Sequence, residues 1–151
     1  MKQQKQDALA MLKADHQQVL ALFKDYEALS DRSKVSKQRL AGKICTELRV
    51  HAELEERLFY PAVRAQVDDD DLMDEALVEH AAAKDLIAQI EELDPEDDLY
   101  DARVKVLSEQ IQHHVEEEEG PMFAKVRKAG IDLLALGTQM AELKQQLTGK
   151  S

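Results

Sequence analysis

Two stretches of the chain repeat one pattern, a histidine followed four residues later by a glutamate. The first pairs His51 with Glu55, and the second pairs His114 with Glu118. Four residues of an α-helix advance about 400° and roughly 6 Å, so the imidazole and the carboxylate of each pair point the same way, one turn apart. Two such pairs on facing helices predict a site that holds two metal ions.

Apolar residues recur at intervals of three and four along five segments, which predicts five helices. Their ranges are about 7–29, 34–67, 72–93, 104–126 and 132–147. Short polar loops between the four long segments favour an all-α fold, an antiparallel up-down four-helix bundle with a short additional C-terminal helix. We therefore interpret residues 1–151 as one domain, with the bundle over about 7–128 and the last helix over about 132–147.

Both histidine–glutamate patterns run into a proline. Pro61 is expected to kink the second helix or to begin its last, irregular turns, because proline lacks the backbone donor. Gly120-Pro121 predicts a similar distortion of the fourth helix, one turn beyond Glu118.

Each of the four long helices places one histidine in its apolar stripe, near mid-helix, and two of them add a glutamate. A lone histidine on an apolar face is usually a hydrogen-bonded core residue. Burying all of these groups without a strong common partner costs roughly 1–3 kcal/mol each, and a shared metal supplies that partner. The candidate metal ligands are His16, His51, Glu55, His80, His114 and Glu118.

Four imidazoles and two carboxylates exceed what one tetrahedral zinc needs. They match two metal ions, each with two histidines, bridged by two carboxylates. Donors of nitrogen and oxygen without thiolate suit iron or manganese better than copper(I) or an iron–sulfur cluster. The Glu-x-x-His pairs of ferritin-type di-iron proteins and the His-Glu-x-x-His signature of metalloproteases do not occur in this sequence.

The order of these residues resembles the haemerythrin-like (HHE cation-binding) family, from the first helix through Lys128. The resemblance implies a bundle that houses a non-haem di-iron centre with an oxo or hydroxo bridge, with manganese and zinc as less favoured metals. It implies the six candidates as ligands, with Glu55 and Glu118 bridging. The motifs that carry it are His16, His51-x-x-x-Glu55-Glu56 ending in Phe59-Tyr60-Pro61, Glu79-His80, and His114-x-x-x-Glu118-Glu119 ending in Met122-Phe123.

The sequence departs from the oxygen carriers of that family at two positions. The carriers have a second histidine four residues after the third-helix one, where this chain has Lys84, and an aspartate at a slightly different spacing where it has Glu118. An open position on one iron is therefore expected. It disfavours reversible O₂ carriage and favours reaction with O₂, peroxide or nitric oxide.

Several neighbours of the motifs are open to two interpretations. Lys84 is expected in solvent or against a spare carboxylate, because burying an ammonium beside cations is costly. Tyr60 is expected to pack, with a role as iron ligand or redox neighbour as the alternative. His113 is interpreted as a surface or second-sphere residue that forms an alternative pair with Glu117, and residues 116–119 are otherwise interpreted as a solvated face.

Composition limits the partners and the compartment. The formal net charge of −11 disfavours nucleic acid and anionic membrane surfaces, which would repel the chain. The single cysteine, Cys45, rules out an intramolecular disulfide and fits a reducing compartment. Residues 1–6 lack the apolar core of a secretory signal, and no apolar run has transmembrane length. A cytoplasmic monomer or dimer is expected.

The function predicted from these observations is binding, sensing or detoxification of O₂, peroxide or nitric oxide at a di-iron site. A catalase-like or peroxidase-like enzyme using the same site is the first alternative. The second is a metal-dependent regulatory interaction module, whose output would need a separate protein partner. The opposing hypothesis is a metal-free structural bundle.

Overall fold

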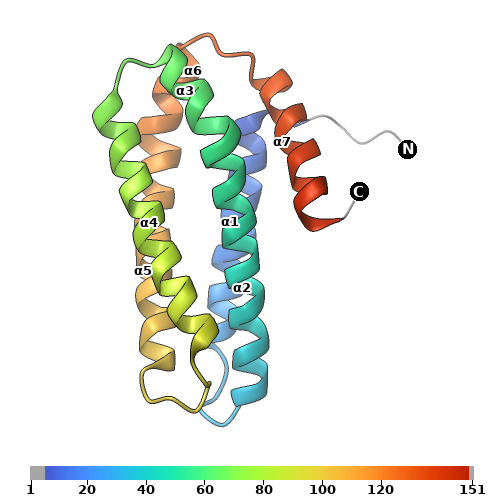
Figure 1. The fold of residues 1–151 in the computed structure, drawn as a ribbon, viewed down its shortest axis with the longest axis vertical. Coiled ribbons are helices and arrows are strands. Elements are labelled where there is room, and N and C mark those ends of the chain that lie inside the picture. Colours follow the sequence, from blue (N-terminus) through green and yellow to red (C-terminus); the bar gives the residue numbers. More distant parts are fainter. Residues whose placement is uncertain (1–5, 150–151) are drawn as a thin grey trace.

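The computed structural model describes residues 6–149, and this part of the chain is helical without any strand. Four long helices run alternately down and up the molecule: α1 (Ala8–Glu27), α2 (Lys34–Leu54), α4 (Asp70–Glu92) and α5 (Tyr100–Glu117) (Figure 1). α1 packs on α2, α4 packs on α5, and the pairs meet through α2 with α4 and α1 with α5. The predicted antiparallel up-down bundle is confirmed.

Two of the long helices change their winding before they end. α2 passes through a π-helical turn, η1 (Glu55–Phe59), into α3 (Tyr60–Gln66). α5 passes in the same way through η2 (Glu118–Met122) into α6 (Phe123–Lys128). The distortions that the prolines predict are therefore present, but each begins at a candidate glutamate ligand, a few residues before the proline.

The prolines account for the wide turns. Pro61 and Pro121 have no backbone N–H, and the ring of each would clash with the carbonyl four residues earlier in an α-helix. The chain instead makes hydrogen bonds with a spacing of five residues, from the N–H of Tyr60 to the carbonyl of Glu55 and from the N–H of Phe123 to that of Glu118. Such π-helical turns are frequently found at functional sites.

The apolar core is divided into two parts, one toward the α3 and α6 end and one toward the opposite loops. The candidate histidines separate the two parts on every helix. His16, for example, lies between Leu12 of the first part and Val19 of the second, and His51 lies between Leu54 and Leu48. The bundle thus has a polar layer at mid-height, closed by apolar side chains above and below.

The fifth predicted helix is α7 (Leu133–Thr148), which packs along α1 and α2 outside the bundle (Figure 1). Gly137 permits this approach, because a Cβ at that position would meet the backbone of Gln6 and Ala8. Among the helices within residues 6–149, none is both long and apolar enough to cross a membrane.

Candidate metal centre

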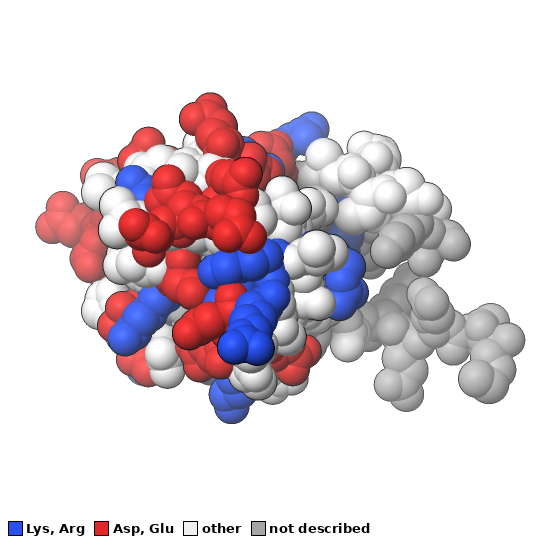
Figure 2. Space-filling view, turned by 90° about the horizontal axis from the view of Figure 1, so that it is seen from below, with Lys and Arg blue, Asp and Glu red and all other residues white. Residues whose placement is uncertain are grey.

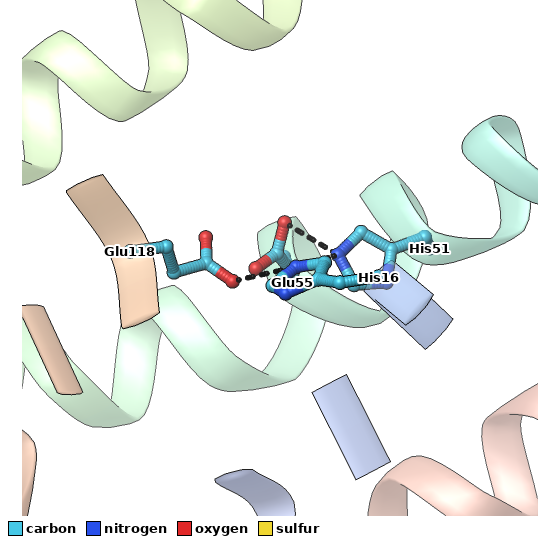
Figure 3. A group of neighbouring side chains, drawn as sticks. All are labelled: His16, His51, Glu55 and Glu118. Atoms are coloured by element: carbon cyan, nitrogen blue, oxygen red, sulfur yellow. Dashed lines mark hydrogen bonds and ion pairs between the residues drawn. The ribbon is translucent and has the colours of Figure 1, made fainter. Parts of the chain in front are cut away.

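The structure brings all six candidate ligands into the polar layer, in two groups that share Glu55. The first group is His16, His51, Glu55 and Glu118, whose ligand atoms all lie within 4.8 Å of one another (Figure 3). His51 Nε2 is 3.2 Å from Glu55 Oε1, His16 Nε2 is 3.3 Å from Glu118 Oε1, and the two Nε2 atoms are 3.2 Å apart. These ligands come from α1, α2 and the two π-helical turns.

The second group is Glu55, His80 and His114, again with all ligand atoms within 4.8 Å. Glu55 Oε1 lies 3.0 Å from His80 Nε2 and 3.9 Å from His114 Nε2. Glu118 approaches this side too, with its Oε2 3.1 Å from His114 Nε2. Both glutamates therefore face both groups.

The four imidazoles are held in one orientation by carboxylates outside the two groups. Each Nδ1 faces such a carboxylate, so each Nε2 points inward. A hydrogen bond donated by one ring nitrogen fixes the tautomer and leaves the other nitrogen to bind a metal. The Nδ1 contacts are His16 with Glu119 at 2.6 Å, His51 with Asp15 at 3.1 Å, His80 with Glu56 at 2.9 Å, and His114 with Glu79 at 2.7 Å.

The two central glutamates are fully buried, yet three of their four carboxylate oxygens lack hydrogen-bond partners. Neither carboxylate oxygen of Glu55 makes a hydrogen bond, and neither does Oε1 of Glu118. Most buried polar groups in folded proteins are hydrogen-bonded, and an unsatisfied one costs about 1–3 kcal/mol. Metal ions would satisfy these oxygens, so the residues present fit a pair of bound metals.

Without metal, nearby carboxylates raise the pKa of His51 and of His114. Burial lowers the pKa of His51, but the charge of Glu55 and the hydrogen bond with Asp15 outweigh it and raise that pKa to about 10. Burial likewise opposes protonation of His114, yet Glu118 and Glu55 raise its pKa to about 12. Metal binding must displace these protons, since a ligating Nε2 is unprotonated.

Tyr60 is part of this site, whereas packing was its favoured role from the sequence. Its hydroxyl donates to Glu118 Oε2 at 2.9 Å and lies 3.1 Å from His80 Nε2 and 3.2 Å from His114 Nε2. Burial raises the pKa of Tyr60, and the charges of Glu55 and Glu118 raise it further. The residue is therefore a protonated phenol that faces the second group of ligands.

The remaining neighbours are placed as follows. Lys84 pairs with the spare carboxylate of Glu56, its Nζ 2.8 Å from Oε1, as expected. His113 lies at the surface with a 62% exposed side chain, also as expected. Glu119, in contrast, does not belong to a solvated face, because it accepts from His16. Asp15 escaped the sequence analysis because nothing in its own helix pattern marks it as a partner of His51.

A cavity of about 240 Å³ adjoins the site. It is lined by the four candidate histidines and by apolar side chains from the part of the core opposite the α3 and α6 end, such as Val19, Leu48 and Ile111. Its lining continues to the surface at His113. Small molecules and ions can therefore reach the buried ligands from solvent.

Comparison with known proteins assigns this architecture to a family. The family model of the hemerythrin HHE cation-binding domain matches residues 7–126. The chain belongs to this family. A curated relative of this hemerythrin-domain chain is a DNA nickase of Nostoc sp., 32% identical over 117 residues, which is 78% of this chain and 32% of the relative. The chain thus spans about a third of the length of that relative.

A solved structure shows the same fold. It is the crystal structure of a hemerythrin HHE cation-binding domain-containing protein from Mycobacterium kansasii, with a TM-score of 0.82 and 24% identity. The match covers 95% of this chain and 88% of the other. At this identity the likeness concerns the fold alone, and it agrees with the helical bundle described above.

Proposed function

We propose that this hemerythrin-domain chain holds two iron ions and binds O₂, peroxide or nitric oxide at them. The ligands in this proposal are the six residues of the two groups, with Glu55 and Glu118 as bridges. The observation that carries it is a pair of fully buried glutamates, of whose four oxygens three lack hydrogen bonds, while four Nε2 atoms point at them. Imidazole and carboxylate donors without thiolate suit iron among the transition metals.

The two groups differ in a way that favours reaction with an added ligand. With Glu55 and Glu118 shared, each group has two imidazoles and two carboxylates, but only the group of His80 and His114 faces the Tyr60 hydroxyl. At the position where the oxygen carriers have a further histidine, Lys84 is held by Glu56. Bound iron would supply an open coordination position, and we place that position on the His80 and His114 side.

The residues around that position supply a hydroxyl group, an apolar enclosure and carboxylates that orient the imidazoles. The Tyr60 hydroxyl oxygen lies 3.1 Å from His80 Nε2 and 3.2 Å from His114 Nε2. Its proton is donated to Glu118 Oε2, and rotation of the hydroxyl would redirect this proton to a small ligand bound there. The apolar layers above and below limit the access of bulk water. The outer carboxylates keep the imidazoles in place while the ligand enters and leaves.

Spectra of the iron-loaded protein with and without azide, nitric oxide and peroxide test this proposal. Added azide should shift the charge-transfer bands, because it occupies the open position. Tyr60→Phe should keep the bound iron but slow the reaction with peroxide, whereas Tyr100→Phe, a buried tyrosine outside the site, should leave the rate unchanged. Bands that no added ligand shifts would show that no position is open.

A catalase-like activity is the second candidate, favoured by the Tyr60 hydroxyl beside His80 and His114. The balanced reaction converts two molecules of hydrogen peroxide into one of O₂ and two of water. An oxygen electrode measures it directly. Release of O₂ no faster than with an equal amount of free iron would exclude this candidate and leave ligand binding intact.

No observation on this chain favours the DNA cleavage that the Nostoc relative is named for. The net charge of −11 opposes approach to a phosphate backbone, and acidic side chains gather over part of the loop end of the bundle (Figure 2). We therefore propose no nickase role for it. Conversion of supercoiled plasmid to open circles, above the level given by free iron, would overturn this view.

A further inference from the structure

A third group of potential metal ligands lies at the surface, apart from the buried centre. It consists of Glu79 on α4 and of His113 and Glu117 on α5, with all three ligand atoms within 4.8 Å of one another. His113 Nε2 is 3.1 Å from Glu117 Oε1 and 3.8 Å from Glu79 Oε2. The alternative histidine–glutamate pair of the sequence is therefore completed by a third residue from the neighbouring helix.

This surface group is connected to the buried centre in two ways. Glu79 faces His113 with Oε2 and accepts from Nδ1 of His114 with Oε1, at 2.7 Å. One carboxylate thus lies between a surface imidazole and a buried candidate ligand. The cavity provides the second connection, because its lining includes Glu79 and His113 as well as His51, His80 and His114.

The chemistry of the group suits a divalent cation that binds and leaves again. One imidazole and two carboxylates are donors for Fe²⁺, Mn²⁺ or Zn²⁺. Solvent reaches the site, since the His113 side chain is 62% exposed and that of Glu117 34%. Water therefore fills the remaining coordination positions, and three protein ligands in water hold a cation less firmly than a closed cage does. Glu55 and Glu118, in contrast, are fully buried, so a metal can reach them only through the protein.

We propose that Glu79, His113 and Glu117 form a surface capture site for a divalent cation, which passes from there through the cavity to the buried centre. Capture requires only the surface group. Transfer rests in addition on the proposed function of the buried centre. The two parts are therefore tested separately.

The first experiment measures transfer as the rate at which metal-free protein takes up Fe²⁺ under anaerobic conditions. His113→Asn and Glu117→Gln each remove one of the three ligands and leave Glu79 free to hold His114. Loss of an outer partner of a metal ligand already weakens affinity by about 10–100-fold. We therefore expect loss of a ligand to slow uptake at low Fe²⁺ at least tenfold, with unchanged final iron content. Glu116→Gln is the matched control, since it removes the same charge from an exposed position of the same helix.

Two results of this experiment would overturn the transfer proposal. One is uptake at the unmodified rate in both ligand variants. The other is equal slowing in Glu116→Gln, which would assign the effect to general charge and not to the three ligands. A lower final iron content in the ligand variants would also count against it, because these residues would then belong to the final site.

The second experiment measures capture alone, by calorimetric titration of Zn²⁺ into Glu55→Gln, which lacks the ligand shared by both buried groups. We expect one weakly bound Zn²⁺ per chain in this variant, and none after His113→Asn is added. Absence of any binding in Glu55→Gln overturns capture, even if the unmodified protein holds two irons. One surface Zn²⁺ together with an unmodified protein whose centre takes up no iron would instead refute the proposed function and leave capture standing.

Discussion

Two polar clusters of the bundle, each with buried side chains, differ in how completely their atoms are paired. One is the mid-height layer of candidate ligands. The other lies near the loop end and consists of Tyr26, Lys37 and Asp101. In this loop-end cluster the Tyr26 hydroxyl donates to Asp101 at 2.6 Å, and Lys37 Nζ, although only 3% of the residue is exposed, donates to Asp101 at 2.9 Å.

The loop-end cluster needs nothing from outside the chain. Its ammonium, phenol and carboxylate satisfy one another, and Lys37 Nζ lies 5.8 Å from the centre of the Tyr26 ring. In the mid-height layer, both oxygens of Glu55 remain without a hydrogen bond. Burial of a charged group is therefore not evidence of a ligand. A ligand site is indicated instead by buried metal-binding atoms that converge on one point and have no hydrogen-bond partner.

The largest expected effect is loss of metal from Glu55→Gln, because this carboxylate belongs to both groups. An amide of the same shape cannot supply the bridging charge. We expect iron content to fall to the background level, measured by elemental analysis after anaerobic reconstitution. Asp101→Asn is the matched variant in the loop-end cluster and should bind iron as the unmodified protein does. Equal iron content in the two variants would remove the distinction between the clusters.

Asp101→Ala should instead lower the free energy of unfolding, by about 1–3 kcal/mol, because it leaves the buried ammonium of Lys37 with only the exposed carboxylate of Asp31, 3.8 Å away. Denaturation with urea measures this change. Lys37→Met should cost much less, since the apolar side chain needs no partner. If Asp101→Ala also changed the metal affinity by more than twofold, the two clusters would not be independent.

A smaller effect is expected from the carboxylates that orient the imidazoles. Asp15 accepts from His51 Nδ1 and is itself held by Lys144 of α7 at 2.8 Å. Asp15→Asn should weaken metal binding by about 10–100-fold without abolishing it, the usual range for such partners. Competition with a chelator measures the affinity. An Asp15→Asn protein as devoid of metal as Glu55→Gln would make Asp15 a ligand in its own right.

The smallest effect concerns the acid stability of the loop-end cluster. Burial raises the pKa of Asp101, but the hydrogen bonds from Tyr26 and Lys37 outweigh burial and bring it below its usual value. The stabilisation is therefore complete above the pKa of the unfolded chain, about 4, and is lost as the pH falls through the lower folded value. Unfolding of metal-free Asp101→Asn at pH 7 and at pH 3 should show a weaker pH dependence than the unmodified protein. If the free energy of unfolding changed equally between pH 7 and pH 3 in both proteins, the interactions of Asp101 with Tyr26 and Lys37 would not stabilise the fold.

Much of this architecture follows from the sequence. The spacing of apolar residues places the four long helices, and histidines that occupy stripe positions must face the core when the helices pack. The six candidate ligands lie together for that reason. The family resemblance adds the expectation of an oxo- or hydroxo-bridged di-iron centre, and the match to residues 7–126 confirms the family.

The residues that the sequence does not place correctly depend on the rotation of a helix about its own axis or on contacts between helices. A π-helical turn accommodates one extra residue, so it rotates everything beyond it by about 100° relative to an α-helix. Tyr60 directly follows such a turn, which is why the α-helical period does not place its hydroxyl at the site. Glu119 and Asp15 escape prediction because their partners lie on other helices. Lys37 escapes because lysine is usually solvated.

The most direct test of the central claim is the iron content and Mössbauer spectrum of protein reconstituted anaerobically with Fe²⁺ and then oxidised. If the unpaired oxygens of Glu55 and Glu118 bridge two metals, the protein will hold two irons per chain with the diamagnetic ground state of a coupled ferric pair. One iron per chain, or two without magnetic coupling, would contradict the bridged centre. No iron at all would show that the buried histidines and glutamates belong to a polar core that needs no metal.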